Sequence, residues 1–329
     1  MTELPAPEIR APNEVRVKVR AAALNRLDLW MTAGLPNVSP VFPFVVGSDG
    51  AGVVDAVGAA VRSLRPGDRV MINPGLSCGH CPACVDGDEP LCREYCIMGE
   101  HMPGTAAELV VVPEENLAPV PETMSWPEAA GFTLATLTAW RMLTARARLR
   151  AGETALIWGI GGGVSLAALQ IVNLLGGRAI VTSGSDAKLE RARALGALGV
   201  LNHGRDDVVS EVRHLTGGRG ADVIVDSVGA QTWVNSQRAL RRGGRIVICG
   251  ATTGPTVSLD LRRLFWHQWS LLGSTMGSRR EFAEIVRLAH QGRLWPIVDR
   301  VVPLADGAAA YERMQRGEHT GKLVLEVSS

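Results

Sequence analysis

Four of the six cysteines stand close together at spacings that suit a metal ion. They form the pattern Cys78-x2-Cys81-x2-Cys84-x7-Cys92. Four thiolates spaced in this way can close a tetrahedron around Zn²⁺ and leave no position for water or substrate. Short cysteine spacings also serve iron–sulfur clusters, so iron is the rival interpretation. In a chain of 329 residues the pattern predicts a structural metal site, because disulfide frameworks are typical of much smaller secreted domains.

A run of glycines is the second chemical feature. Gly159-Ile160-Gly161-Gly162-Gly163-Val164 follows the apolar run Thr154–Trp158 and leads into the apolar segment Val164–Leu175. Glycine lets the backbone turn sharply and approach a pyrophosphate, whose charge then lies at a helix N-terminus. The run alone could be only a tight turn, but a strand before it and a helix after it favour dinucleotide binding. We expect the cofactor to contact Gly159, Gly161, Gly162, Gly163 and Val164.

The end of the next expected strand, Ala179–Thr182, bears on which nicotinamide cofactor is bound. An Asp or Glu there would bind the ribose 2′-hydroxyl of NAD and repel a 2′-phosphate. This chain has Ser183-Gly184-Ser185 followed by Lys188 and Arg191, and small hydroxyls with nearby cations favour NADP(H). The two cations could instead be the solvated face of a helix, and Asp186 is one residue late for the ribose role, so NAD(H) stays open. The predicted contacts are Ser183, Gly184, Ser185 and Lys188.

The elements that must position these residues fall into three zones. Residues 1 to 127 read as an irregular, β-rich region, in which Val15–Val19 alternates with a period of two. Residues 128 to 273 alternate short strands of β-branched residues with helices, which predicts a parallel sheet buried on both faces. The last stretch has an amphipathic helix and a closing strand. The expected later elements are helices Ala187–Leu195, Gln231–Leu240 and Glu281–His290 and strands Asp222–Asp226, Arg245–Cys249 and Lys322–Val327.

Composition narrows the function classes. The formal net charge is +1 without any block of like charge, so no basic face indicates nucleic acid or an anionic membrane. The longest apolar stretches, such as Ala167–Leu175, are too short to span a bilayer. The N-terminus lacks a charged start followed by an apolar run, so we expect no secretion signal and a cytoplasmic protein. Length and apolar content suit two packed domains.

Several motifs together resemble the medium-chain dehydrogenase/reductase superfamily, namely its zinc alcohol dehydrogenases and, more closely, its quinone-oxidoreductase-like members. The resemblance covers nearly the whole chain, although an N-terminal β-hairpin typical of the family is missing. Besides the cysteine lobe, the motifs are Ala23-Leu24-Asn25-Arg26-Leu27-Asp28, Gly47-Ser48-Asp49-Gly50-Ala51-Gly52, Pro66-Gly67-Asp68-Arg69-Val70 and Gly321-Lys322.

This resemblance implies an α/β protein with a GroES-like, β-rich catalytic domain and a Rossmann cofactor domain with a doubly wound parallel sheet. The first would comprise residues 1–133 and 274–329, with a zinc lobe at 76–98, and the second residues 134–273. It favours structural zinc over iron. It implies a homodimer or homotetramer in which Trp269–Thr275 pairs across the dimer. It also places Asn202, Gly250, Ser274 and Lys322 at the cofactor.

The chain departs from the family at the catalytic metal. In the zinc-dependent members the position of Asn25 is a cysteine, that of Ser48 a histidine and that of Leu134 usually a third ligand, while a glutamate falls at Asp49. Asn and Ser are poor zinc ligands and Leu is none. We therefore expect that the catalytic zinc is lost and that the structural zinc remains.

The loss of this metal restricts the chemistry. Without zinc, reduction of a simple ketone loses several kcal/mol of transition-state stabilisation, whereas a conjugated carbonyl or quinone spreads the charge of the added hydride. By position Asn25 could donate its amide to the substrate oxygen, with Ser48 nearby, although capping or turn bonding is an equal alternative. Asp28 is expected to orient its neighbours. His101 is the candidate proton donor, with a structural role as the alternative.

The sequence thus predicts an NADP(H)-dependent oxidoreductase that reduces small-molecule quinones or α,β-unsaturated carbonyl compounds without catalytic zinc. An alcohol dehydrogenase that uses NAD(H) is the first alternative. The second is a cofactor-binding protein with a structural or nucleic-acid-binding role, as the lens crystallins of the quinone-reductase-like family suggest.

Overall fold

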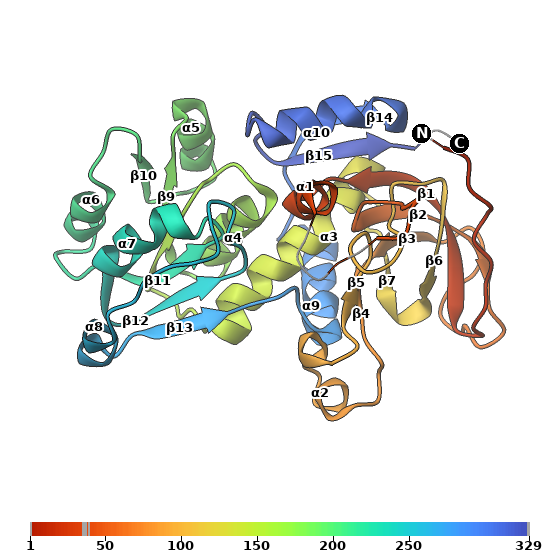
Figure 1. Ribbon diagram of the computed structural model, residues 1–329, viewed down its shortest axis with the longest axis horizontal. Helices are drawn as coiled ribbons and strands as arrows, with labels where there is room; N and C mark the ends of the chain where they lie inside the picture. The colour runs from red at the N-terminus through yellow and green to blue at the C-terminus, as the bar shows by residue number, and fades with distance from the viewer. Residues whose placement is uncertain (1, 35–37, 39, 328–329) are drawn as a thin grey trace. The chain divides into compact units, whose positions relative to one another are not determined.

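The computed structural model describes residues 2–34, 38 and 40–327 of the chain. It divides into two compact units (Figure 1). The first unit comprises Met1–Leu137 and Met276–Ser329, and the second comprises Thr138–Thr275. The boundaries expected from the sequence lie a few residues away, after positions 133 and 273.

The first unit is built on a seven-stranded sheet with the order β14-β15-β1-β2-β3-β7, in which β6 also pairs with β1. Strand β1 is antiparallel to β2, β6 and β15, and β14 is parallel to β15. The strands are β1 (Glu14–Ala23), β2 (Asp49–Val57), β3 (Arg69–Ile72), β6 (Leu109–Pro113), β7 (Leu117–Pro119), β14 (Val298–Pro303) and β15 (Lys322–Glu326), with β4 (Gly75–Leu76) and β5 (Cys96–Ile97) as a separate pair. Its helices are α1 (Arg26–Ala33), α2 (Pro82–Val85), α9 (Arg279–His290), α10 (Gly307–Gln315) and the first part of α3 (Trp126–Arg141), with short 3-10 turns η1 (Glu89–Leu91), η2 (Glu114–Asn116) and η4 (Leu304–Asp306).

The core of this unit follows from the alternation in β1. Val15, Val17 and Val19 are buried on one face, while Lys18 is exposed on the other. Successive side chains of a strand point to opposite faces, so a period of two lays every second residue on the core. The predicted half-buried strand is confirmed.

The second unit has a six-stranded sheet with the order β10-β9-β8-β11-β12-β13, and every recorded pairing in it is parallel. The strands are β8 (Thr154–Ile157), β9 (Arg178–Ser183), β10 (Gly199–Asn202), β11 (Ala221–Asp226), β12 (Leu240–Ile248) and β13 (Ser270–Gly273). The helical segments are α4 (Gly163–Leu174), α5 (Asp186–Ala194), α6 (Val208–Leu215), α7 (Ala230–Ala239), α8 (Leu261–His267) and a π-helical turn η3 (Met142–Arg146). The predicted parallel sheet between helices is confirmed.

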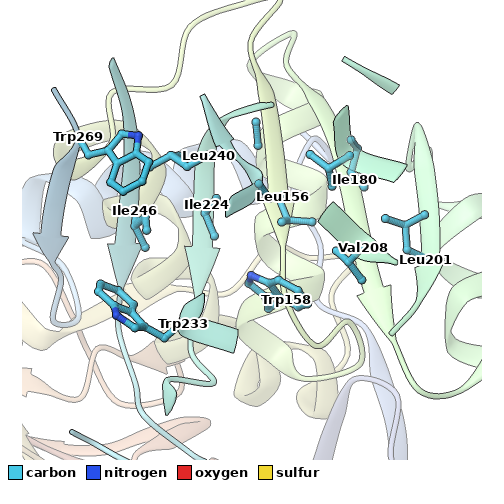
Figure 2. Packing of buried hydrophobic residues seen from close by; sticks show 13 residues of the cluster. Leu156, Trp158, Ile180, Leu201, Val208, Ile224, Trp233, Leu240, Ile246 and Trp269 are labelled. Carbon is cyan, nitrogen blue, oxygen red and sulfur yellow. The ribbon is translucent and has the colours of Figure 1, made fainter. Parts of the chain in front are cut away.

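Aliphatic side chains from neighbouring strands line up in the core of the second unit (Figure 2). Leu156, Ile180, Ile224 and Ile246 are fully buried. Trp158 packs with them, and its indole Nε1 donates to the Ser236 hydroxyl at 2.8 Å. A parallel sheet covered by helices buries both faces, which explains its continuous apolar strands.

The chain passes from β8 outward through β9 to β10, then crosses back to β11 beside β8 and continues to β12 and β13. The strand order therefore reverses between β8 and β11. In open α/β sheets ligands bind at the carboxyl ends of the strands at such a reversal. The glycine run follows β8 at this point. No helix in the described part of the chain is long and apolar enough to cross a membrane.

Candidate functional site

Four polar side chains meet in the interior of the first unit. The Lys322 ammonium donates to the Asn25 amide oxygen at 2.6 Å and to Asp49 Oδ2 at 2.8 Å. The amide nitrogen of Asn25 donates to the same carboxylate oxygen at 2.9 Å, and the Thr133 hydroxyl donates to Asp49 Oδ1 at 2.6 Å. We call Asn25, Asp49, Thr133 and Lys322 the polar cluster. Its ion pair is shielded from solvent, with side-chain exposures of 4% for lysine and zero for aspartate.

The sheet explains why these residues meet. Ala23, the last residue of β1, is paired with Asp49 on one side and with Val324 on the other. Leu24 continues the second pairing, since its N–H donates to the Leu323 carbonyl at 2.9 Å. The chain that leaves β1 therefore passes between the starts of β2 and β15. Asn25 must then lie beside both Asp49 and Lys322.

Asp28 fixes the two backbone segments that carry this site. Its Oδ2 accepts from the Asn25 N–H at 2.7 Å in a capping box at the start of α1, and its Oδ1 accepts from the Gly47 N–H at 3.1 Å. Burial raises the pKa of Asp28 to about 6, although the Asn25 hydrogen bond and the charge of Lys322 lower it. The orienting role expected for Asp28 agrees with these contacts.

Ser48 is fully buried next to Asp49, and within the described residues its hydroxyl makes no hydrogen bond. The backbone N–H of Leu134 donates to Asp49 Oδ1 at 2.7 Å, and its side chain is aliphatic. Among the described residues, the groups of His, Cys, Asp or Glu that could share a metal both lie in the cysteine lobe. A zinc ion at Asn25, Ser48 and Leu134 therefore does not fit the side chains present, because none is a good zinc ligand.

The structure corrects the predicted use of Asn25 as a free amide donor. Its amide nitrogen is bound to Asp49 and lies 3.4 Å from the Ala23 carbonyl, while its amide oxygen is bound to Lys322. Only 9% of the residue is exposed. The side-chain amide is engaged with Asp49 and Lys322, which are distant in the sequence, so neither a free donor nor a local capping or turn bond describes it.

His101 belongs to a turn that packs on the segment before Ser48. Gly99 of this turn lies so close to Gly47 that an added Cβ would come within 2.6 Å of the Gly47 oxygen. The His101 side chain is 42% exposed, and its Nδ1 accepts from the Ile97 N–H at 3.2 Å. An accepting Nδ1 places the proton of the neutral ring on Nε2. Burial raises the pKa of the neighbouring Glu100 carboxyl, which lies 3.9 Å from Nδ1, and the charge of His101 lowers it.

The four predicted metal ligands converge in the lobe between β4 and β5. The sulfur of Cys78 lies 3.9 Å from that of Cys84 and 3.6 Å from that of Cys92, and Cys81 and Cys84 are 3.5 Å apart. Zinc–sulfur bonds of about 2.3 Å place the corners of a tetrahedron about 3.8 Å apart. The donor set therefore fits one structural zinc ion. His80 bends back to the Cys78 carbonyl at 2.8 Å, and a second possible group joins Cys78 to His80 and Glu94.

The glycine run forms a turn with the features of an anion site. Gly159 and Gly161 have positive φ angles of 67° and 140°, which side chains rarely adopt. Gly162 precedes α4 without any side-chain cap, so the backbone N–H groups that start at Gly163 and Val164 lack intrahelical partners. These groups fit a pyrophosphate.

The Ser165 side chain bonds to the glycine turn. Its hydroxyl accepts from the Gly161 N–H at 3.3 Å and lies 3.1 Å from the Gly159 oxygen and 3.0 Å from the Gly162 oxygen. Ser165 thus bonds to the inner side of the turn and holds its shape.

The end of the Lys188 side chain lies close to the glycine turn. An added Cβ on Gly161 would meet the Lys188 Cδ at 2.8 Å and its Nζ at 3.1 Å. The end of this side chain therefore lies against the glycine turn, where a pyrophosphate would bind. Ser183 accepts from the Ser185 N–H at 3.1 Å, and Gly184 faces the His203 ring.

The remaining predicted cofactor contacts are spread over both units. Asn202 is bound to Asp186, with its amide nitrogen 2.9 Å from Oδ1. Gly250 follows β12 and lies against Ser227, and Ser274 is buried with a hydroxyl that has no partner among the described residues. Lys322 belongs to the polar cluster. Contact of these four residues with a cofactor stays a prediction.

The sequence did not mark two residues, one in the polar cluster and one beside Asp186. Thr133 lies inside a helix, where no motif marks it, and Arg205 forms a 2.9 Å ion pair with Asp186 from a loop after β10. Asp49 was noted only as a replacement for a glutamate. The motif Gly321-Lys322 marked the lysine of the polar cluster, but a motif does not indicate which side chains the lysine binds.

Comparisons with known proteins agree with this architecture. Residues 11–122 match the family described as alcohol dehydrogenase GroES-like domain, and residues 163–291 match zinc-binding dehydrogenase. The chain is 31% identical to an alcohol dehydrogenase of Geobacillus stearothermophilus (95% of this chain, 92% of the relative). It is 32% identical to a crotonyl-CoA carboxylase/reductase of Cereibacter sphaeroides (93% and 78%). A solved structure described as NAD-dependent alcohol dehydrogenase has a TM-score of 0.94 at 46% identity (99% and 95%). The chain therefore belongs to the medium-chain dehydrogenase/reductase superfamily of oxidoreductases.

Proposed function

We propose that the protein is an NADP(H)-dependent reductase of quinones or α,β-unsaturated carbonyl compounds that works without a catalytic metal. One observation carries the proposal. At the positions where the zinc-dependent members bind the catalytic metal, this chain has Asn25, Ser48 and Leu134, and Asn25 is hydrogen-bonded to the Lys322 ammonium. A buried cation at 2.6 Å from that position opposes the binding of a divalent cation.

The substrate class follows from the missing Lewis acid. In an alcohol dehydrogenase the metal stabilises the alkoxide as hydride moves, a contribution of several kcal/mol. An enone or quinone needs less help, since the negative charge spreads over a conjugated system and modest hydrogen-bond donors suffice. The similarity to a crotonyl-CoA reductase supports this class, because a crotonyl group is an α,β-unsaturated acyl group.

The bound nicotinamide would supply the hydride, and the chain's own residues would position the reactants and manage the proton. Of the predicted catalytic residues, His101 has the exposed side chain, and its neutral ring holds a proton at Nε2. We assign the proton donor to His101, whose ring would take up a second proton from solvent, give one to the substrate and so return to its neutral form. Asp28 and Lys322 hold Asn25 in place, so their contribution is the shape and charge of the site.

Preference for NADP(H) is part of the proposal. Ser183, Gly184 and Ser185 at the end of β9 leave the site without a carboxylate at the usual ribose position. The second candidate is an alcohol dehydrogenase that uses NAD(H). It is favoured by Asp186, whose carboxylate stands at the first residue of α5, and by the name of the 46% identical structure.

The cysteine lobe would hold a single structural zinc ion. Four thiolates leave no open position for substrate, so the metal would stabilise the lobe. A thiolate site of this kind suits a reducing compartment, which supports a cytoplasmic location. We also propose a homodimer or homotetramer. Two observations on the described residues support self-association. Strand β13 is an edge strand of its sheet, and Phe265 and Trp266 of α8 are exposed.

The test is oxidation of NADPH with an enone and with a quinone, compared with reduction of NAD⁺ by an alcohol. We expect turnover in the first two assays and none in the third, with or without added zinc. Elemental analysis accompanies the assays. Alcohol oxidation that depends on a second bound metal would refute the proposal, and cofactor binding without any turnover would favour the structural role.

A further inference from the structure

The carboxylate that bears on cofactor choice is held by two partners. Asp186 Oδ1 accepts from the Asn202 amide at 2.9 Å, and Oδ2 accepts from the Arg205 guanidinium at 2.9 Å. Arg205 and Asn202 lower the pKa of Asp186, so this carboxyl stays ionised at neutral pH. Asp186 follows Ser185 directly, and the ion pair therefore stands at the end of β9.

Arg205 is placed by a tight loop. The backbone N–H groups of Arg205 and Asp206 donate to the Asn202 carbonyl at 3.0 and 2.8 Å, and the Asp206 carboxylate accepts from the Asn202 N–H at 2.7 Å. Asn202 in turn is paired with Ser183 across the parallel strands β9 and β10. The loop thus carries Arg205 to the strand end where an adenosine ribose binds in this fold.

The pair is open to a ligand. The side chains of Arg205 and Asp186 are 62% and 64% exposed. A guanidinium has five N–H donors in a planar fork, so a bond to one carboxylate oxygen leaves donors for a phosphate. Asp186 alone would repel a phosphate at this place, and Arg205 offsets part of that charge. Arg205 Nε also lies 3.6 Å from Asp206 Oδ1, so a phosphate would compete with two carboxylates for the guanidinium.

We propose that Arg205 is the specificity-determining residue for the 2′-phosphate of NADPH, and that Asp186 acts against it by favouring a free 2′-hydroxyl. The inference rests on the proposed cofactor preference and adds the residue that sets it. The end of Lys188 lies against Gly161 at the glycine turn, whereas Arg205 is bonded to Asp186 directly after Ser185. A 2′-phosphate is bound by the arginine fork, whereas a 2′-hydroxyl donates to the carboxylate.

The experiment measures the dissociation constants of NADPH and NADH by fluorescence titration for the wild type, Arg205→Met, Asp186→Asn and the double variant. The fragments 2′,5′-ADP and 5′-AMP are titrated as competitors, because they differ only at the proposed subsite. Arg193→Met is the matched control. Arg193 is an exposed arginine on α5, the helix that begins at Asp186, and forms an ion pair with Glu190.

We expect Arg205→Met to weaken NADPH and 2′,5′-ADP by about 10- to 100-fold and to change NADH and 5′-AMP by less than about threefold. Asp186→Asn should weaken NADH and strengthen NADPH. The double variant should bind NADPH more tightly than Arg205→Met alone, since the uncompensated carboxylate is gone. Arg193→Met should change neither cofactor, and thermal unfolding of all variants checks that they fold.

An unchanged ratio of NADPH to NADH affinity in Arg205→Met would overturn the inference, as would an equal loss for both cofactors. The two proposals fail in different ways. A wild type without NADPH preference whose ratio still moves toward NADH in Arg205→Met supports the inference and refutes the NADP(H) proposal. A wild type that prefers NADPH and is insensitive to Arg205→Met does the reverse.

Discussion

Replacement of Lys322 by methionine should destabilise the first unit by about 3 kcal/mol. Methionine keeps the length of the side chain and removes the ammonium. The structure buries this ammonium almost completely and places it 2.8 Å from Asp49 Oδ2, which is itself fully buried. The variant therefore leaves a carboxylate in the interior without its counter-charge.

The magnitude follows from the contacts that are lost and retained. At an effective dielectric constant of about 20, two unit charges 2.8 Å apart attract by about 6 kcal/mol. Part of this loss is offset, because the desolvation of the ammonium is also removed. Asp49 keeps three hydrogen bonds, from Asn25, Thr133 and the Leu134 N–H. The net cost should lie at the lower end of the range of about 3–5 kcal/mol for breaking a buried pair.

Urea unfolding, followed with a probe in the first unit, measures this cost as a shift of the midpoint without a change in slope. For a unit of this size the same loss corresponds to about 6–12 °C in Tm. Lys18→Met is the control, since Lys18 lies on β1 with an exposed side chain. The double variant Asp49→Asn with Lys322→Met should recover at least half of the stability, because both charges are then absent.

A loss below about 1 kcal/mol in Lys322→Met would refute the reasoning, because such a value is typical of an exposed pair. A double variant that is less stable than Lys322→Met would also contradict it. In that case the hydrogen bonds of the Asp49 carboxylate, and not the compensation of its charge, would stabilise the site.

Four further predictions can be checked independently. Chelation of the metal should lower the Tm of the protein more than it lowers the turnover of the molecules that stay folded, and elemental analysis should find a single zinc per chain; stoichiometric iron would contradict this. Burial raises the pKa of Asp28 to about 6, so this carboxyl binds a proton more tightly in the folded protein than in the unfolded chain. As the pH rises from about 4 to about 6, the wild type should therefore lose up to about 3 kcal/mol of stability relative to Asp28→Asn. Unfolding experiments at each pH measure this loss. His101→Ala should cost about ten- to a thousandfold in turnover with NADPH binding intact, and Asn25→Ala should do the same through the lost geometry of the polar cluster, as steady-state kinetics with an enone and a quinone will show. Ser185→Asp should reverse much of the NADPH preference by charge repulsion, and equal cofactor affinities in the wild type would remove its basis.

Local patterns in the sequence were sufficient for the features whose geometry is local. The glycine run had to form a turn between a strand and a helix, since positive φ angles and an uncapped helix start need only neighbouring residues. The same holds for the cysteines, which lie within fifteen positions of one another, and for the alternation in β1. In these cases the order of residue types fixes both the backbone conformation and the partners.

The polar cluster and the Asp186–Arg205 pair were decided by the tertiary structure. Lys322 and Asn25 are 297 positions apart. They meet only because β15 pairs with β1, in a register that places Val324 opposite Ala23. Arg205 reaches Asp186 because β9 and β10 are parallel neighbours. Residue types state which groups could bond, but the strand order selects the pairs. For that reason the sequence left donation to substrate and local bonding equally open for Asn25, whereas the folded chain engages its amide with Lys322 and Asp49.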